Sequence, residues 1–199
     1  METTLEKISR LKDRLKALKK ADSALQVFGA NYHKYRSSKP MTEKEVLAFE
    51  RQHAITLPED YRTFLLTVER GGAGPYYGLF PPTDYSHELE NVKSDFLSLP
   101  FPHQEAWPFA EDSMDQSILD EEHKYFGNFW VQGAMRLCPF GCGAIIVLVI
   151  TGKARGQIWM DDRPNDYGVV PIANDFLTWY EEWLERSFIE LQNMQKRRP

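Results

Sequence analysis

Asp161, Asp162 and Arg163 are the residues whose types and spacing come closest to catalytic chemistry. Two neighbouring carboxylates can hold a divalent cation or act as an acid and a base. Consecutive side chains at the end of a strand point to opposite faces, however, so adjacent aspartates rarely act on one atom. No base with an orienting partner accompanies them, which leaves a hydrolase as a minor hypothesis. We expect Asp161 or Asp162 to pair with Arg163 or to hydrogen-bond the Pro164-Asn165-Asp166 loop.

The other nucleophiles and metal ligands lack the spacing of a known site. Cys138 and Cys142 are separated by three residues, but no second pair or nearby histidine completes the four ligands of a tetrahedral zinc site. The five histidines show no HExxH spacing, and the sequence holds no GxSxG elbow, P-loop or dinucleotide fingerprint. We therefore expect two buried thiols and a surface or half-buried His53. The sequence predicts no catalytic residue, no metal and no cofactor.

The charged residues are distributed unevenly along the chain. Residues 1–45 hold 11 Lys and Arg against 6 Asp and Glu, whereas residues 83–122 hold one Lys against 11 Asp and Glu. Such an acidic segment repels nucleic acid and attracts a basic partner. Within it we select Glu111, Asp112 and Asp115 as candidate partner-binding residues. The alternative is a solvated face without a partner, which is the commoner meaning of a charge run.

The stretch from Leu57 to Pro82, LPEDYRTFLLTVERGGAGPYYGLFPP, contains a helix followed by a glycine turn. Pro58 and two acidic residues begin the helix, and two glycines end it. Its apolar stripe comprises Tyr61, Phe64, Leu65 and Val68. We expect a short aromatic strand over residues 76–80. Because loops carry binding residues more often than cores do, Tyr76 and Tyr77 are further candidates for partner binding.

Spacings of three and four residues predict helices at both ends of the chain. The first helix has a narrow apolar seam of Leu5, Ile8, Leu11, Leu15 and Leu18. We expect this seam to pack within the molecule, so we favour a monomer. Thr42 and Glu45 form a capping box at the start of another helix. The last helix carries a wide apolar stripe, in which we expect Trp179 and Trp183 to be buried.

Strand patterns occupy the region between these helices. We expect strands at residues 129–131 and 135–138, a central strand at 144–151, its hairpin partner at 157–161 and an edge strand at 169–172. The polar residues 83–124 are expected to be irregular. This order of elements indicates an α+β fold, with a mostly antiparallel sheet packed by helices. We divide the chain into an N-terminal helical extension, residues 1–39, and a domain of residues 40–199.

The chain shows no sign of a membrane or secretory segment. No run of about eighteen apolar residues is present, so we expect neither a transmembrane helix nor a membrane partner. The N-terminus is charged and lacks the apolar core of a signal peptide. We therefore predict a cytoplasmic protein.

Two separated stretches resemble one protein family. The first is LPEDYRTFLLTVERGGAGPYYGLFP, and the second runs from GCGAIIVLVITGKARGQIWMDDR to DFLTWYEEWL. In this order they are similar to the SUKH superfamily, which includes the fungal Smi/Knr cell-wall regulators and many bacterial proteins. The resemblance covers about residues 40–186, whereas residues 1–39 lie outside it.

The resemblance implies helices on a mostly antiparallel sheet and a protein-binding role without an established catalytic motif. Bacterial members are commonly immunity proteins that neutralise a cognate toxin of a polymorphic toxin system, often a nuclease or a deaminase. Because such toxins bind phosphate through basic faces, an acidic inhibitor can occupy them. We therefore expect an immunity protein, and the alternative is a cytoplasmic regulatory scaffold of the Smi/Knr type. To the acidic residues and tyrosines above we add Asp162 and Asp166, from the loop after the hairpin, as partner-binding residues.

Overall fold

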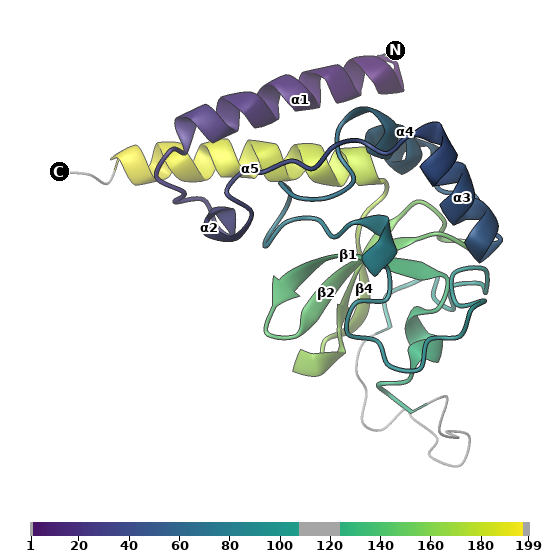
Figure 1. Cartoon of the computed structure of the whole chain (residues 1–199). Coiled ribbons are helices and arrows are strands. Elements are labelled where there is room, and N and C mark those ends of the chain that lie inside the picture. The colour runs from purple at the N-terminus through teal and green to yellow at the C-terminus, as the bar shows by residue number, and fades with distance from the viewer. Residues whose placement is uncertain (1, 108–123, 197–199) are drawn as a thin grey trace.

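The computed structural model describes residues 2–107 and 124–196, and it combines helices with one antiparallel sheet (Figure 1). The helices are α1 (Thr4–Ala21), α2 (Ala30–His33), α3 (Glu43–His53), α4 (Glu59–Thr67) and α5 (Phe176–Lys196). Within the same ranges, the 3-10 helices are η1 (Pro82–Asp84), η2 (Asn128–Val131) and η3 (Arg163–Asn165). The strands are β1 (Ala134–Gly141), β2 (Ala144–Val149), β3 (Ile158–Asp162) and β4 (Gly168–Ala173). The predicted α+β fold is confirmed.

The sheet has the simplest antiparallel topology, in which each strand pairs with the next one along the chain. All six residues of β2 are buried, as its β-branched run predicts for a central strand. Arg136 of β1 lies opposite Val147, which in turn lies opposite Trp159 of β3. Directly opposite residues share a face, and Asp161 lies two residues after Trp159. Arg136 and Asp161 therefore project from the same face of the sheet.

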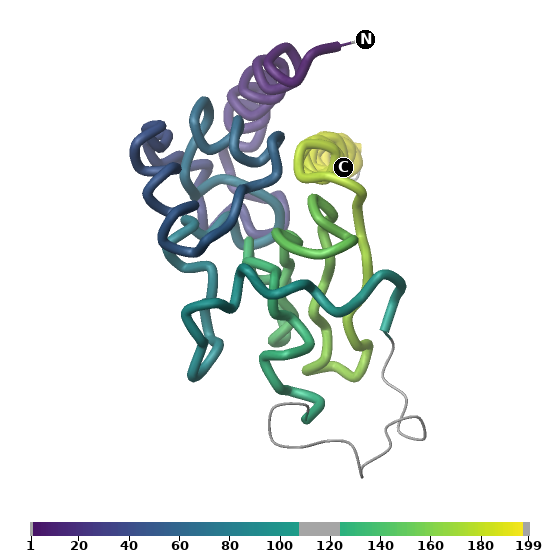
Figure 2. The backbone as a smooth tube through the Cα atoms, turned by 90° about the vertical axis from the view of Figure 1, so that its right-hand side faces the viewer, coloured from purple at the N-terminus to yellow at the C-terminus, as the bar shows by residue number. Residues whose placement is uncertain are grey.

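Irregular segments cover both edges of the sheet. Along β1, the N–H of Phe80 donates to the carbonyl of Leu137 (2.7 Å), and the N–H of Arg136 donates to that of Tyr85 (2.9 Å). Along β4, Trp107 and Val169 exchange two backbone hydrogen bonds. The segment before Trp107 crosses the sheet (Figure 2). These segments bond to backbone groups that an open edge would offer to another chain.

The N-terminal helix packs inside the molecule, alongside α5 and parallel to it (Figure 1). Its ion pairs keep one register, because Arg10 pairs with Glu181 and Arg14 pairs with Glu185. The predicted seam is confirmed for four residues, which are buried: Ile8, Leu11, Leu15 and Leu18. It is wrong for Leu5, which is exposed. The division of the chain into residues 1–39 and 40–199 stays a prediction.

The starts of α3 and α5 follow their sequence signals, whereas the predicted glycine stop of α4 is wrong, because this helix ends at Thr67, before Gly71. At α3, the Thr42 hydroxyl accepts from the N–H of Glu45, and the Glu45 carboxylate accepts from the N–H of Thr42, so the capping box is confirmed. At α5, Asp175 accepts from the N–H of Thr178 (2.7 Å). Trp179 and Trp183 are buried, as predicted. Although α5 has 21 residues, no helix in the described ranges is both long and apolar enough to cross a membrane.

Two strand predictions are wrong. Residues 76–80 form a turn, in which Tyr76 has a φ of 53°. Their β-type pairing is limited to one isolated bridge, between Leu79 and Gly72. A positive φ reverses the extended path that a strand needs. Residues 129–131 belong to η2. Their apolar pattern is too short to distinguish a strand from a helical turn.

Two side-chain predictions are also wrong. His53 is buried, because it packs between Phe49 and Tyr85 at ring-centroid distances of 4.6 and 4.7 Å. Cys142 is exposed in the β1–β2 turn, whereas Cys138 is buried as predicted. Burial raises the pKa of the Cys138 thiol, which keeps it protonated.

Candidate functional site

The β1–β2 turn, residues 141–143, is the point around which the described candidate residues gather. Its three residues have φ values of 124°, 51° and 83°. Glycine adopts such values without steric cost, which accounts for Gly141 and Gly143. A Cβ added to Gly143 would lie 3.1 Å from Cβ of Pro164, and one on Gly141 would lie 3.5 Å from Cε2 of Tyr77. The turn is thus in contact with η3 on one side and with the tyrosines on the other.

Five aromatic side chains on the tyrosine side make two neighbouring groups of ring contacts, which together we name the aromatic patch: Phe28, Tyr32, Tyr76, Tyr77 and Phe140. The ring of Tyr77 makes edge contacts with Phe28 and Tyr32, at centroid distances of 5.3 and 4.7 Å. Tyr76 contacts Phe140 at 4.6 Å. Phe28 is 54% exposed and Tyr32 is 67% exposed. The patch therefore presents aromatic surface to solvent while its rings support one another.

The close approach of α2 to the tyrosine turn depends on Gly29. This residue precedes α2 and has a φ of 79°. A Cβ at this position would lie only 1.7 Å from the carbonyl oxygen of Tyr76. No side chain fits in that space, so glycine is required here. This contact brings Phe28 and Tyr32 within reach of Tyr77.

The other side of the turn is held by the loop after β3. Asn165 donates from its side-chain amide to the carbonyl of Cys142 (3.1 Å) and to the carboxylate of Asp162. Asp162 is buried, so its carboxylate links η3 to the turn. Asp166 follows η3 with a φ of 62° and is exposed.

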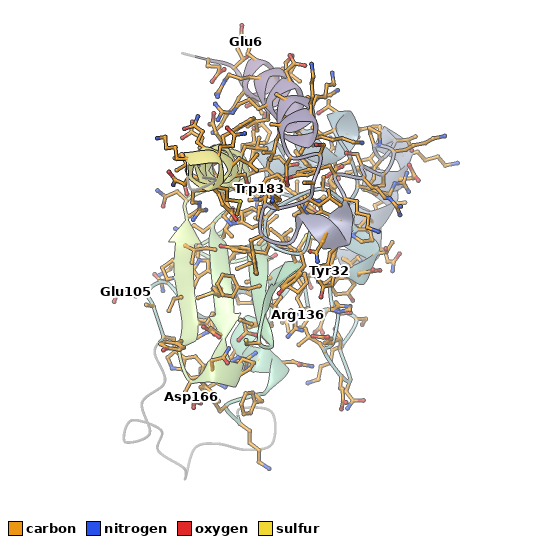
Figure 3. All side chains as sticks on the ribbon, turned by 90° about the vertical axis from the view of Figure 1, so that its left-hand side faces the viewer. Glu6, Tyr32, Glu105, Arg136, Asp166 and Trp183 are labelled. Atoms are coloured by element: carbon orange, nitrogen blue, oxygen red, sulfur yellow. The ribbon has the colours of Figure 1, made fainter. Side chains whose placement is uncertain are left out.

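Tyr77 therefore contacts one side of the turn, and Asp162 is linked to its other side through Asn165, while Tyr76 and Asp166 are their chain neighbours. Figure 3 looks onto this side of the molecule, with Tyr32 above and Asp166 below. The other three candidates, Glu111, Asp112 and Asp115, lie outside the described residues. A role in partner binding stays a prediction for all seven residues.

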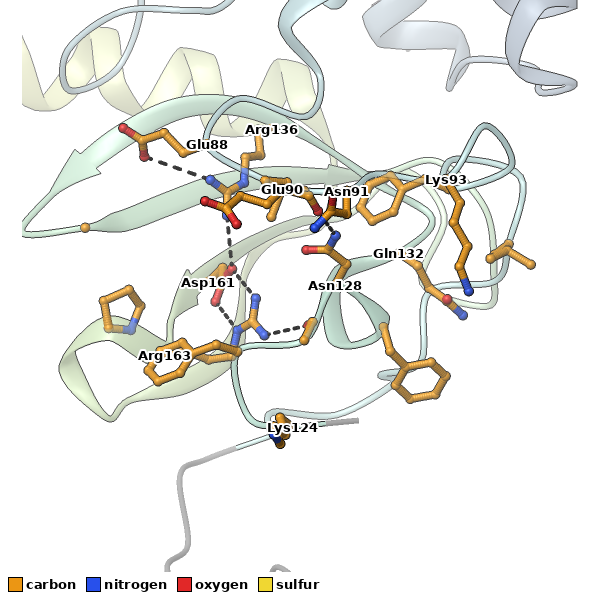
Figure 4. A pocket seen from close by; sticks show the side chains of 18 residues that line it. Glu88, Glu90, Asn91, Lys93, Lys124, Asn128, Gln132, Arg136, Asp161 and Arg163 are labelled. Atoms are coloured by element: carbon orange, nitrogen blue, oxygen red, sulfur yellow. Dashed lines mark hydrogen bonds and ion pairs between the residues drawn. The ribbon is translucent and has the colours of Figure 1, made fainter. Parts of the chain in front are cut away.

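A pocket opens beside the same turn, and Gly143 and Pro164 form part of its wall. Its volume is about 770 Å³, which is within the range of small-ligand sites, roughly 300–1,000 Å³. Arg136, Asp161 and Arg163 bring charged groups into it (Figure 4). We name it the arginine pocket.

Asp161 and Arg163 form a complete ion pair in this pocket. Nε of Arg163 donates to Oδ1 of Asp161 (2.7 Å), and Nη2 donates to Oδ2 (2.8 Å). Nη1 of Arg163 also donates to the carbonyls of Tyr125 and Gly127 (2.8 and 3.0 Å). Asp161 thus pairs with Arg163 while Asp162 bonds the following loop, so each aspartate takes one of the two expected roles.

Arg136 lies against this pair but is far less well bonded. It is only 9% exposed. Its Nη1 donates to the carbonyl of His87, and its Nη2 lies 3.9 Å from Oδ2 of Asp161. Nε has no hydrogen-bond partner in the described structure. Burial lowers the pKa of Arg136, the charge of Arg163 lowers it further, and Asp161 opposes both effects.

This arrangement does not support the chemistry first suggested by the adjacent aspartates. Both carboxylate oxygens of Asp161 accept from Arg163, and Asp162 is bonded to Asn165 on the other side of the chain. The two carboxylates therefore do not converge on one atom. Within residues 2–107 and 124–196, no three His, Cys, Asp or Glu side chains are grouped as metal ligands.

The family comparison agrees with the fold. The sequence model of the SMI1 / KNR4 family (SUKH-1) matches residues 40–182. The chain belongs to this family. No curated protein and no solved structure matches it.

The SUKH match contains most of the candidate site. Tyr76, Tyr77, Phe140 and the arginine pocket lie within residues 40–182. Phe28 and Tyr32 precede the match, as does α1. The aromatic patch is thus assembled from the SUKH region and from the segment in front of it.

The sequence prediction missed Phe28, Tyr32, Phe140 and Arg136. The three aromatic residues carry no local signal, because their contacts with Tyr76 and Tyr77 are formed only by the folded chain. Arg136 does carry one, since it is a charged residue between Met135 and Leu137 in a predicted strand. A charge on a strand with covered faces is costly unless it is paired, so Arg136 could have been selected as a candidate site residue.

Proposed function

We propose that this SUKH protein is a non-catalytic binding protein that neutralises a cognate bacterial toxin of the nuclease or deaminase class in the cytoplasm. The observation that carries the proposal is the aromatic patch, found in a chain of this family. Bacterial SUKH proteins are commonly immunity proteins, and such proteins act by covering a surface of their toxin.

The patch has the composition of an energetic centre for binding. Tyrosine is enriched among the residues that dominate protein interfaces, because it buries a large area with few rotatable bonds. The rings of Tyr32 and Tyr77 are already in contact in the free protein. Less conformational freedom is then lost on binding, which favours affinity.

The acidic residues have a separate part in the proposal. Glu111, Asp112, Asp115 and Asp166 supply negative charge that attracts the basic, phosphate-binding face of a nuclease or deaminase. Charge of this kind raises the association rate and fixes the register of the partner. The tyrosines, in contrast, slow dissociation. Asp162 acts indirectly, since its bond to Asn165 holds the loop that bears Asp166.

The test uses as the partner the product of a toxin gene found next to the gene of this protein, and the absence of such a gene would favour the regulatory alternative. The protein is expected to protect cells that express this toxin and to co-purify with it. Tyr77→Ala and Tyr32→Ala should each increase the dissociation rate about tenfold or more, with the salt dependence retained. Leu5→Ala is the matched control, because Leu5 is an exposed apolar residue on α1.

The charged residues are tested by the same rate measurements at two salt concentrations. Reversal of Glu111, Asp112 and Asp115 to Lys should slow association and weaken its salt dependence. An unchanged association rate would show that the acidic segment is only a solvated face. If the toxin does not bind but a cellular protein binds through the aromatic patch, the alternative of a Smi/Knr-type regulatory scaffold holds.

A further inference from the structure

Two buried arginines in the arginine pocket differ sharply in how their donors are used. Arg163 is 3% exposed and makes four hydrogen bonds to a carboxylate and two carbonyls. Arg136 is 9% exposed and makes one, to the carbonyl of His87. A guanidinium has five N–H groups, and on Arg136 Nη1 donates to His87 whereas the buried Nε has no acceptor in the described structure. A buried donor without an acceptor is costly, and so is a buried guanidinium charge whose partners are incomplete.

The charges at the floor of the pocket do not balance. Among the pocket-lining residues that the structure describes, Asp161 is the only buried carboxylate, and Arg163 uses both of its oxygens. The other acidic groups of the lining are Glu88 and Glu90, which are both exposed. Glu88 comes no closer to Nη1 of Arg136 than 4.0 Å. Glu88 is exposed, and Asp161, 3.9 Å from Nη2 of Arg136, is shared with Arg163, so among the described residues two buried guanidinium groups face one buried carboxylate.

The rest of the pocket provides room and an apolar wall. Leu89, Phe96 and Phe129 line it next to the charged floor. Figure 4 shows the guanidinium groups of Arg136 and Arg163 on either side of Asp161, with Glu88 and Glu90 at the rim. A group of one negative charge with several acceptor oxygens would meet the free donors of Arg136 and restore the charge balance.

We propose that the arginine pocket is a receptor for one oxyanion, a carboxylate or a phosphate group, held by Arg136. Asp161 and Arg163 are positioning residues, because their ion pair fixes the floor against which Arg136 is placed. Glu88 competes with the oxyanion for Arg136 from the rim. The site is a property of this chain alone and does not depend on toxin binding. The oxyanion has two sources, an acidic side chain of a protein partner or a free anion.

The first experiment uses the full chain with inorganic phosphate and with acetate as probes, at constant ionic strength set with chloride. The Nε–H resonance of Arg136 is followed by NMR, and that of Arg155, an exposed arginine in the β2–β3 connection, is the internal control. A saturable shift at Arg136 without one at Arg155 is the expected result. A response at Arg136 that is absent, or that rises linearly as at Arg155, overturns the proposal.

The second experiment uses substitutions that leave the buried network in place. Glu88→Gln should tighten binding of the probe roughly fivefold, since it removes a carboxylate about 4 Å from the anion's arginine partner. Glu105→Gln is the matched control, because it removes an exposed charge that is not part of the pocket. Equal tightening in both variants would place the anion elsewhere and overturn the assignment. In the Arg136→Gln variant, phosphate should no longer cause a saturable shift in the resonances of the other residues that line the pocket. Circular dichroism checks that this variant is folded.

The third experiment distinguishes the source of the oxyanion. In the complex with the toxin, phosphate no longer shifts the Arg136 resonance if a carboxylate of the partner occupies the pocket. The shift persists if the physiological ligand is a free anion. Failure of toxin binding leaves the phosphate titration of the free protein unaffected. The oxyanion site and the proposed immunity function are thus tested separately.

Discussion

Glu69 lies in an environment that a carboxylate disfavours. It lies two residues after α4, is 0% exposed, and neither carboxylate oxygen has a partner with hydrogen-bond geometry in the described structure. Burial raises its pKa to about 8, although the Ser37 hydroxyl offsets part of the rise. The folded protein therefore holds a proton on Glu69 at neutral pH, whereas the unfolded chain does not.

The first prediction follows from this difference in proton binding. Between the ordinary pKa near 4.5 and the folded value near 8, unfolding releases the Glu69 proton, so stability falls as pH rises. One proton corresponds to about 1.4 kcal/mol per pH unit. Glu69→Gln should remove this slope and make the variant more stable than the parent protein above pH 7. Urea unfolding from pH 5 to 9 measures it.

The control for this measurement is Glu59→Gln, at the exposed start of α4. It removes one negative charge without removing a buried carboxyl group. If Glu69→Gln and Glu59→Gln change the pH dependence of the unfolding free energy by the same amount, the prediction is wrong. Glu69 would then be ionised in the folded protein despite its burial.

At the scale of elements, α5 acts as the support against which α2 is placed. Trp183 contacts the rings of Tyr180 and of His33, at centroid distances of 5.1 and 6.1 Å. His33 is buried, and burial lowers its pKa to about 4. The same α2 carries Tyr32 of the aromatic patch. The packing of α5 thus determines where one binding residue lies.

The second prediction concerns this packing. Trp183→Ala should destabilise the protein by about 3–5 kcal/mol, because it removes a buried aromatic side chain. It should also raise the pKa of His33 toward its ordinary value near 6.5, since solvent then reaches the ring. Urea unfolding and NMR titration of the imidazole measure the two effects. The control is Ile189→Ala, an exposed position on the same helix. An unchanged His33 titration in a destabilised Trp183→Ala protein would contradict the assigned contact.

The elements differ in how far their sequence predicts them. The helices at 43–53 and 176–196 and the strand at 144–149 were predictable, because their apolar spacing and caps are local signals. Residues 76–80 were not, since the positive φ of Tyr76 depends on contacts with other parts of the chain. The burial of His53 likewise depends on Tyr85, 32 residues away.

The same distinction applies to the candidate site. The pairing of Asp161 with Arg163 could be predicted, because the residues are two apart on one strand end. The position of Arg136 beside that pair could not, since it requires the register in which β1, β2 and β3 lie side by side. Sequence reasoning therefore found the single aspartates and tyrosines but missed the surfaces to which they belong.

For the whole molecule, the open question is whether residues 1–39 are part of the minimal fold. The SUKH match begins at residue 40, and the sheet with its edge covers lies within residues 40–182. Yet α1 buries four apolar residues, and Asp22 accepts hydrogen bonds from Gln26, Val27 and Tyr35. The extension is thus well packed without contributing a strand.

The third prediction is that a chain beginning at Met41 still unfolds cooperatively but at a lower urea concentration. Each buried Leu or Ile of α1 contributes about 1.5–3 kcal/mol. The conformational entropy of ordering this segment opposes these contacts, so we expect the net loss of stability to be smaller than the sum of the contacts. Trp183 also loses its contact with His33, so its fluorescence should shift to the red.

Urea unfolding monitored by tryptophan fluorescence and by circular dichroism tests this prediction. Coincident sigmoidal transitions in the shortened chain would establish residues 40–199 as a domain that folds alone. A broad transition without a baseline, together with strong binding of a hydrophobic dye, would show that α1 is part of the core. In that case α1 and α5 form one inseparable layer of the core, and the minimal fold begins before the SUKH match.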